Sequence, residues 1–305
     1  MSPNADAAAP GPLHLQDIPI PPPRGAIGIV PSPKRRASAA SSWSLIETKE
    51  NTEPRTLKKT LSHVDHAQAM ARNPDHLEEF EVPDNYWARL TKSLLAEFIG
   101  TYFLVSTVAL STGQAGIVFM APLAIGLTLT VMIFAFGHIS GAHFNPAVTL
   151  AVWLRGKIDL VGSACYLGAQ LAGAFCAAYQ QLLVSSDSGF TSGYPAPGAK
   201  VSWYVAVITE FTYTFALATV ILQTATTKAQ KGNSFFGLAI GMTVTSAAWA
   251  AGGISGGAFN PAVGTALPLV HGHYENIWLY WAGPCLGAAA ASGMFRLTAD
   301  PSELD

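Results

Sequence analysis

Long apolar stretches alternate with short polar segments over the last two thirds of the chain. Six of these stretches are long and apolar enough to cross a lipid bilayer as helices, which takes about 20 residues each. They lie near residues 90–111, 118–138, 159–184, 201–224, 233–252 and 275–296. Two further apolar stretches, 146–154 and 261–270, are only about half as long and cannot cross. The pattern predicts an all-α membrane protein with six transmembrane helices and two half-helices.

The two half-helices are preceded by nearly the same sequence. Residues 139–148 read ISGAHFNPAV and residues 254–263 read ISGGAFNPAV. A proline at the first position of a helix leaves no N–H unpaired, and an asparagine before it can cap the helix. Each segment therefore predicts a loop that turns into a helix. The two Asn-Pro-Ala boxes are Asn145, Pro146 and Ala147, and Asn260, Pro261 and Ala262.

The two halves of the membrane region repeat beyond these boxes. Glu97 precedes Asn145 by 48 residues, and Glu210 precedes Asn260 by 50 residues. A repeat of three spans contains an odd number of crossings, so the second copy must be inverted in the membrane. We therefore expect the half-helices to enter from opposite sides and to meet tip to tip near the midplane. The repeats cover about residues 88–184 and 201–296.

Residues 1–87 differ in composition from the rest of the chain. They hold 9 of the 17 Lys and Arg and 11 of the 19 Asp and Glu, with no sustained apolar period. Such a segment cannot bury enough surface to order itself, so we predict a disordered cytosolic tail. Ser38 follows two arginines and is a candidate phosphorylation site, while a solvated polar run is the simpler interpretation. Residues 297–305 are predicted to be a short cytosolic tail, which leaves 88–296 as the membrane domain.

The positive charges between the spans predict the orientation. Seven Lys and Arg residues fall on one side of a six-span arrangement, and Lys200 falls on the other. Because such residues accumulate on the cytosolic side, both termini are predicted to be cytosolic. The pattern is compatible with the plasma membrane and with a vacuolar or other organelle membrane. The seven residues are Arg89, Lys92, Arg155, Lys157, Lys228, Lys231 and Arg296.

Composition argues against several other classes of function. The chain is 50% hydrophobic and 12% charged, with no basic face of the kind that binds nucleic acid. Its 3 cysteines lie in predicted spans and form no ligand cluster with histidines, so we expect neither a disulfide framework nor a bound metal. We also expect no cofactor and no enzymatic activity.

The loops before the half-helices are candidates for the lining of a pore. Irregular backbone at membrane depth is tolerated only where it is buried or lines a cavity, so residues 137–144 and 252–259 should turn carbonyl groups toward a pore. Asn145 and Asn260 would each add an amide donor beside a positive helix end, which orients water and repels protons and cations. The alternative is that the two asparagines only cap their helices. The predicted lining residues of the loops are Gly141, Ala142, His143, Gly256, Gly257 and Ala258.

Glu97 and Glu210 are ionisable residues inside predicted spans and are therefore functional candidates. One hypothesis is a proton relay of the kind that a coupled transporter uses. The other is a brace, in which each buried carboxylate accepts hydrogen bonds from loop N–H groups that have no helical partner. Their twofold placement beside two irregular loops favours the brace.

The doubled Asn-Pro-Ala box and the paired Glu-Phe segments resemble the aquaporin, or major intrinsic protein, family over about residues 88–296. The resemblance implies an aquaporin-like bundle of six spans and two half-helices. It also implies one pore in each subunit of a homotetramer, through which water crosses the lipid bilayer.

The resemblance places a selectivity filter as well, and there this sequence departs from members devoted to water. Those members carry an arginine after the second box, with an aromatic residue and a histidine as partners. A filter without these groups is expected to be wider, more apolar and less positive. Candidate permeants besides water are glycerol, urea, ammonia and hydrogen peroxide. The corresponding residues here are Ile125, Ala248, Gly257 and Val263.

Three hypotheses of function follow. The first is a passive channel for water and small neutral solutes. The second is an ion- or proton-coupled secondary transporter that uses Glu97 and Glu210. The third is a structural membrane anchor with little conduction. Fast osmotic volume change without an ion gradient would distinguish the channel from the other two.

Overall fold

The computed structural model describes residues 85–304 apart from 115, 117 and 189. Most of the predicted N-terminal tail, including Ser38, lies outside these residues. The first helix begins at Tyr86, so the last two residues of the predicted tail belong to the first span.

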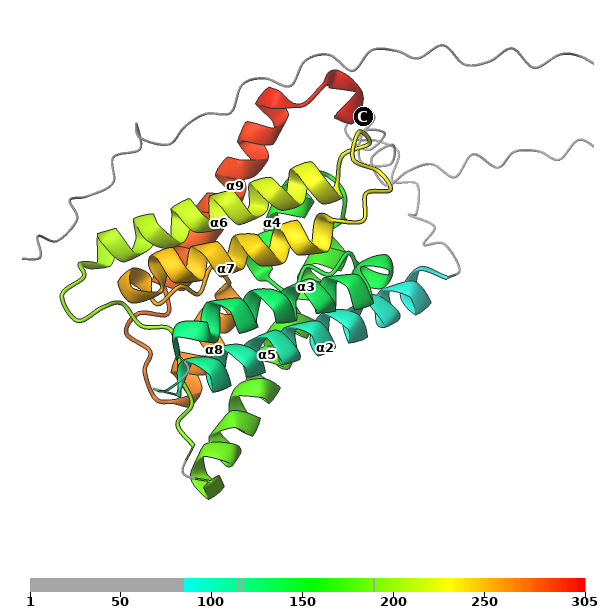
Figure 1. Ribbon diagram of the computed structural model, residues 1–305. Helices are drawn as coiled ribbons and strands as arrows, with labels where there is room; N and C mark the ends of the chain where they lie inside the picture. The colour runs from blue at the N-terminus through cyan, green and yellow to red at the C-terminus, as the bar shows by residue number, and fades with distance from the viewer. Residues whose placement is uncertain (1–84, 115, 117, 189, 305) are drawn as a thin grey trace, which may run out of the picture. The chain divides into compact units, whose positions relative to one another are not determined.

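Eight α-helices and two short 3-10 turns make up the described residues, in the predicted order (Figure 1). Both half-helices begin and end where the sequence predicts, and each longer helix overlaps its predicted span with ends that differ by a few residues. The elements are α2 (Tyr86–Thr112), η2 (Val118–Met120), α3 (Ala121–Ser140), α4 (Pro146–Leu154), α5 (Leu160–Ser188), α6 (Trp203–Ala225), α7 (Phe236–Ser255), α8 (Pro261–Val270), α9 (Leu279–Thr298) and η3 (Pro301–Glu303).

Five helices of the described region are long and apolar enough to cross a membrane: α2, α3 with the η2 turn before it, α5, α6 and α7. The sixth predicted span, α9, has 20 residues but is less apolar, because Gly, Pro, Tyr and Arg stand among its apolar residues. The small residues of α9 allow it to pack closely against α6. A Cβ at Gly287 would lie 2.4 Å from the carbonyl oxygen of Phe211 in α6. The lower hydropathy of α9 therefore reflects a face that packs against another helix.

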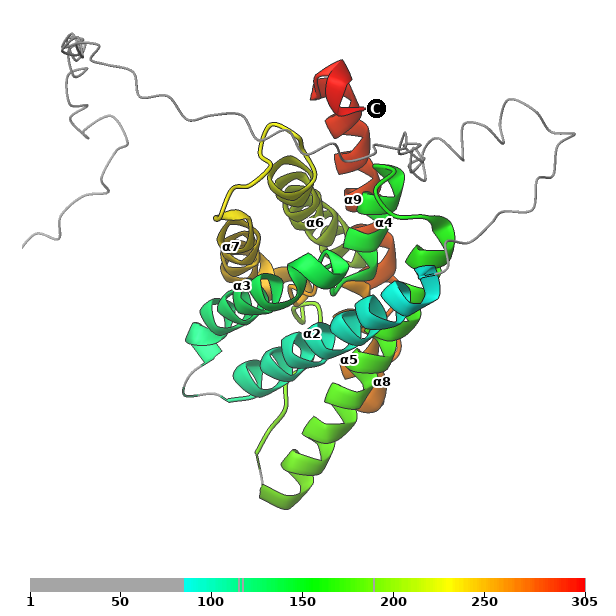
Figure 2. The same cartoon turned by 90° about the vertical axis from the view of Figure 1, so that its right-hand side faces the viewer.

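The helices pack in a series that repeats between the two halves (Figures 1 and 2). In this series α5 packs on α2, α2 on α3, α3 on α7, α7 on α6 and α6 on α9. The short helices α4 and α8 each contact both α5 and α9, so they lie between the two ends of the series. If α2, α3, α4 and α5 exchange places with α6, α7, α8 and α9 respectively, every packed pair becomes another packed pair of the series. The inverted repeat predicts this correspondence.

The close packing around α8 can be tested at Gly264. A Cβ at this position would lie 2.2 Å from the Cβ of Tyr280, which is fully buried. Gly264→Ala should therefore destabilise the protein by about 1–3 kcal/mol, the usual cost of overpacking a core. Gly293→Ala is the matched control, since a Cβ there meets no atom within 4 Å. Thermal unfolding in detergent should show a lower midpoint for Gly264→Ala alone, and equal midpoints would contradict the packing.

The C-terminal residues form structure that the sequence analysis did not anticipate. The predicted tail 297–305 contains the end of α9 and the turn η3, in which Glu303 is buried. Glu303 accepts hydrogen bonds from Lys228 and Ala229, between α6 and α7, and pairs with Arg155 after α4. These segments lie at one end of the bundle, which we call the basic end. It is defined by Arg155, Lys157, Lys228, Lys231 and Arg296.

Candidate functional site

Asn145 and Asn260 cap the half-helices α4 and α8. Each has an extended backbone directly before a proline at the start of the helix. The Oδ1 of Asn145 accepts a hydrogen bond from the N–H of Ala147 at 2.9 Å, and the Oδ1 of Asn260 accepts one from Ala262 at 2.9 Å. These bonds satisfy N–H groups of the first helical turn, which have no partner inside the helix.

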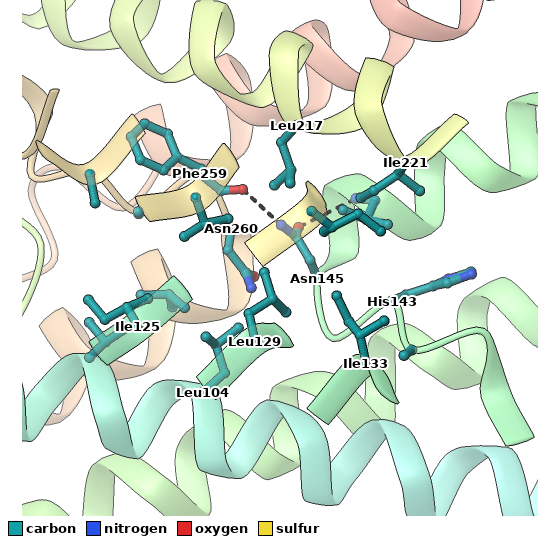
Figure 3. Close-up of a pocket in the computed structure, with 18 of the residues that line it drawn as sticks. Leu104, Ile125, Leu129, Ile133, His143, Asn145, Leu217, Ile221, Phe259 and Asn260 are labelled. Atoms are coloured by element: carbon teal, nitrogen blue, oxygen red, sulfur yellow. Dashed lines mark hydrogen bonds between the residues drawn. The ribbon is translucent and has the colours of Figure 1, made fainter. Parts of the chain in front are cut away.

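The amide nitrogens of the same two side chains tie the half-helices to each other (Figure 3). The Nδ2 of Asn145 donates to the carbonyl oxygen of Phe259 at 2.8 Å, and the Nδ2 of Asn260 donates to that of Phe144 at 2.9 Å. An amide nitrogen carries two hydrogens, so one N–H of each asparagine remains for a further acceptor. This tie was not predicted from the sequence.

The loops before the half-helices have a compact, partly left-handed backbone. Helix α3 continues to Ser140, although a loop was expected from residue 137, and Gly141 ends the helix with φ of 85°. Helix α7 ends in the same way at Ser255, where Gly256 has φ of 94°. Positive φ costs a non-glycine residue about 1–2 kcal/mol, so the loops need bonds from outside to keep this shape. Three such residues are Ala142, Phe144 and Phe259, with φ of 53°, 49° and 48°.

Glu97 in α2 provides bonds of this kind to the first loop. Its side chain is fully buried, and its Oε1 accepts hydrogen bonds from the Ser140 hydroxyl at 2.6 Å and from the N–H of His143 at 2.9 Å. Its Oε2 accepts bonds from the N–H of Phe144 at 2.7 Å and from Nε2 of Gln170 at 2.9 Å. The carboxylate thus joins α2, α5 and the loop.

Glu210 in α6 makes the equivalent contacts in the second half and is also fully buried. Its Oε1 accepts hydrogen bonds from the Ser255 hydroxyl at 2.7 Å and the N–H of Ala258 at 3.0 Å, and its Oε2 accepts one from the N–H of Phe259 at 2.6 Å. Within the described part of the chain, these bonds have no fourth donor that corresponds to Gln170.

Two buried tyrosines hold the ends of α3 and α7. The hydroxyl of Tyr166 donates to the carbonyl of Ser140 at 2.8 Å, and that of Tyr280 donates to the carbonyl of Ser255 at 2.7 Å. The role of this pair was not predicted from the sequence. Repeated spacing is the signal that could have found it, because each tyrosine follows the asparagine of its own half by about 20 residues.

A narrow cavity, which we call the central cavity, surrounds the tips of the half-helices (Figure 3). Its volume of ≈ 60 Å³ accommodates a short file of waters, at about 10–15 Å³ for each. Among the described residues that line it there is no Lys, Arg, Asp or Glu, and its polar side chains are those of His143, Asn145 and Asn260. Apolar side chains around it include Leu104, Ile125, Leu129, Ile133, Leu217 and Ile221.

Two wider cavities flank the central cavity. The basic-end vestibule has a volume of ≈ 490 Å³ and shares Gly141, Ala225 and Phe236 with the central cavity. The far vestibule, at the opposite end, has a volume of ≈ 380 Å³ and shares Ile125 and Gly257, among others, with the central cavity. Because the central cavity shares lining residues with each vestibule, the three cavities lie next to one another along the bundle, in an order that we call the path.

The four residues of the predicted filter come together on this path. All four line the central cavity, and Ile125, Ala248 and Gly257 also line the far vestibule. Val263 is 3% exposed and belongs to the first turn of α8. The predicted loop residues lie on the same path. Gly141, Ala142, His143, Gly257 and Ala258 line the central cavity, and Gly256 lines the far vestibule.

Comparisons with known proteins agree with this architecture. Residues 86–295 match the family described as major intrinsic protein. Nodulin-26 of Glycine max is 35% identical over 213 residues, which cover 68% of this chain and 77% of that protein. Aquaporin NIP1-1 of Arabidopsis thaliana is 35% identical over 246 residues, which cover 76% of this chain and 83% of that protein.

A solved structure shows the same fold. The X-ray structure of the aquaglyceroporin from Plasmodium falciparum aligns with a TM-score of 0.62 at 22% identity, over 70% of this chain and 98% of that chain. Together with the apolar spans and the family match, this fold identifies an integral multi-pass membrane protein. The chain belongs to the major intrinsic protein family.

Proposed function

We propose that the protein is a passive transmembrane channel for water and small neutral solutes. The observation that carries this proposal is the set of three adjacent cavities, the smallest of which contains two asparagine amides and two helix N-termini. A membrane bundle with such a path needs no large rearrangement to conduct. The relatives named as aquaporins support the same function.

Asn145 and Asn260 would bind the oxygen of each passing molecule in the central cavity. One N–H of each amide forms the tie between the half-helices, so the other can donate to the permeant. The apolar side chains of the wall offer no competing hydrogen bond, and the two positive helix ends turn the water oxygen toward the asparagines. A water held in this way cannot hand a proton along the file, and the same potential disfavours cations.

The filter supports the passage of neutral solutes other than water. Ile125, Ala248, Gly257 and Val263 carry no charge, and Gly257 adds no side chain to the wall. A ring without arginine has neither the bulk nor the positive charge that restricts water-selective members. We propose glycerol, urea, ammonia and hydrogen peroxide as candidate permeants.

Glu97 and Glu210 act, in this account, as braces rather than as proton carriers. Both carboxylates are fully buried, both accept hydrogen bonds from loop N–H groups, and neither lines any of the three cavities described above. A relay in a coupled transporter would have to reach the solute path. A structural anchor would not require a set of cavities inside the bundle, so the cavities favour a channel over an anchor.

We propose that the basic end faces the cytosol and that the protein assembles as a homotetramer. The gathering of Lys and Arg at that end supports the orientation. Large apolar side chains are exposed on the outer faces, where they would meet lipid or a neighbouring copy. Examples are Leu127, Val131, Phe134, Leu238 and Trp249.

The double substitution Asn145→Asp and Asn260→Asp separates capping from amide donation. An aspartate can still accept the N–H bonds of the first helical turn, but it has no N–H for the tie or the permeant, and it adds negative charge. We expect the doubly substituted protein to fold, to pass less water and to leak protons or cations. Stopped-flow light scattering and an enclosed pH-sensitive dye in proteoliposomes measure the two effects.

Asn276→Asp, at an exposed position between α8 and α9, is the matched control and should change neither property. Normal water flux without a leak in the doubly substituted protein would remove both asparagines from the proposed mechanism.

A further inference from the structure

One side of the half-helix α4 is not covered by the long helices around it. Helices α5 and α9 are the two ends of the packing series, and no Cα atoms of the two come within 8 Å of each other. α4 lies between them and contacts both (Figure 2). Six of its nine residues are buried, but Trp153 near its C-terminal end is 38% exposed. Since α6 and α8 are its other neighbours, the exposed indole lies on the side that α5 and α9 leave uncovered, which we call the open side of α4.

Two exposed cations stand at the end of α4, beside this indole. The guanidinium of Arg296, near the end of α9, donates a hydrogen bond to the carbonyl of Leu154, the residue directly after Trp153. A guanidinium has five N–H groups, so others remain for a further acceptor. The backbone N–H of Lys157 donates to the carbonyl of Val152 at 3.0 Å, which places Lys157 next to the last turn of the half-helix. Both side chains belong to exposed residues.

The described carboxylates at the basic end are engaged elsewhere. Asp159 caps the start of α5, and Asp300 caps the turn η3. Glu303 pairs with Arg155, and this is the one ion pair within the part of the chain that the structure describes. The two exposed cations at the end of α4 are therefore not neutralised by any of these three carboxylates.

The charges near Lys157 repel one another. Burial lowers the pKa of Lys157, and the neighbouring charges of Arg155 and Lys228 lower it further. A bound anion would relieve this repulsion, since opposite charges at close range stabilise each other.

Large apolar side chains are exposed next to the same two cations. Leu297 follows Arg296 in α9 and is 89% exposed, and Leu160 and Val161 are exposed at the start of α5, shortly after Lys157. Together with Trp153, these side chains offer a surface for hydrocarbon directly beside a pair of positive charges. A molecule that combines an apolar chain with an anionic group matches both features.

We propose that the open side of α4 binds an anionic phospholipid, whose phosphate contacts Arg296 and Lys157 and whose acyl chain lies along Trp153. Guanidinium groups bind phosphate oxygens with charge-assisted hydrogen bonds, and an indole at the membrane surface packs against lipid. Basic sites between membrane helices are places where anionic headgroups bind.

Charge favours a lipid over a second copy of this chain at the open side. Copies that lie in one membrane with the same orientation present the same end at the same depth. The described carboxylates at that end are Asp159, Asp300 and Glu303, and all three already have partners. A neighbouring copy would therefore bring cations, but no free described carboxylate, to Arg296 and Lys157.

Quenching of tryptophan fluorescence by brominated acyl chains tests the site in the full-length protein. The protein is reconstituted in phosphatidylcholine vesicles that contain equal amounts of either brominated phosphatidylserine or brominated phosphatidylcholine. The contribution of Trp153 is the difference between the wild type and Trp153→Phe. We expect phosphatidylserine to quench this contribution at least about twofold more strongly, because basic residues near the surface attract anionic lipids.

The double substitution Arg296→Gln and Lys157→Gln should remove the preference for phosphatidylserine, because glutamine carries no charge. Lys200→Gln, which removes an exposed cation between α5 and α6, is the matched control and should keep the preference. Equal quenching by the two lipids in the wild type, or a preference that survives the double substitution, would overturn the proposal. A Trp153 contribution that neither lipid quenches would show that protein covers the open side, and it would overturn the proposal as well.

Thermal unfolding in detergent gives a second readout, which remains useful if Trp153→Phe does not fold. A lipid that binds only the folded protein raises its unfolding midpoint. Phosphatidylserine should raise the midpoint of the wild type more than phosphatidylcholine does, and this difference should vanish in the doubly substituted protein. No difference in the wild type would contradict the lipid site. An equal rise with inorganic phosphate would show that the occupant is a soluble anion instead of a lipid.

Discussion

Val263→Arg is expected to lower the flux of glycerol and urea at least about tenfold, which corresponds to about 1.4 kcal/mol of added barrier, with a smaller effect on water. Val263 lies in the first turn of α8, is 3% exposed, and faces the central cavity with Ile125, Ala248 and Gly257. Arginine would add a long cation to a cavity of only ≈ 60 Å³. The space that remains should exclude glycerol and urea more strongly than it excludes water.

The effect of size at this position can be separated from the effect of charge. Val263→Met lengthens the side chain without adding charge, so it should reduce glycerol flux even if the arginine variant fails to fold. Val263→Ala should leave glycerol flux equal or higher. Solute fluxes are measured by stopped-flow light scattering on equal amounts of reconstituted protein. If neither Val263→Arg nor Val263→Met reduces glycerol or urea flux, Val263 does not set the width of the filter.

Glu210→Leu is expected to destabilise the protein by at least about 3 kcal/mol and to reduce its assembly. The substitution leaves the Ser255 hydroxyl and the N–H groups of Ala258 and Phe259 without their acceptor at buried positions. Each unsatisfied buried donor costs about 1–3 kcal/mol. The left-handed loop before α8 would then lose the bonds that hold its shape.

Glu210→Gln is the conservative comparison, since its amide oxygen can still accept from part of the loop, and Glu275→Leu controls for loss of charge at an exposed site. Thermal unfolding and size-exclusion chromatography in detergent should rank Glu210→Leu below Glu210→Gln, with Glu275→Leu close to wild type. A Glu210→Leu protein that is as stable as wild type and still conducts would contradict the bracing role. If Glu210→Leu is stable but loses only ion-coupled uptake, the transporter hypothesis gains support.

Local signals in the sequence were sufficient for the helices and the caps of the half-helices. Apolar length gave the spans, and the order Asn-Pro-Ala gave the starts of α4 and α8, because both depend on residues close together in the chain. The ends of α3 and α7 were less accurate. Glycines at 137 and 252 suggested loops, but the helices continue until Gly141 and Gly256 adopt positive φ.

Contacts between distant segments could not be predicted in the same way. The bonds of Asn145 to Phe259 and of Asn260 to Phe144 join residues 114 and 116 positions apart, and they depend on how two loops meet. The burial of Glu303 was also missed, because a single acidic residue near a chain end is ordinarily solvated. The contacts of Glu303 form only when the residue after α4, the α6–α7 loop and η3 are brought together.

The most direct test of the proposed channel is a flux panel on the purified wild-type protein in proteoliposomes. Vesicle volume is recorded after a gradient of an impermeant osmolyte for water, and after a gradient of the solute itself for glycerol, urea and ammonia. Hydrogen peroxide entry is recorded with an enclosed dye. No ion gradient is present in any of these measurements. The proposed channel predicts fast water flux and entry of at least one neutral solute above protein-free vesicles, with no proton leak. Flux at the background level for every permeant, or flux that appears only with an ion gradient, would contradict it.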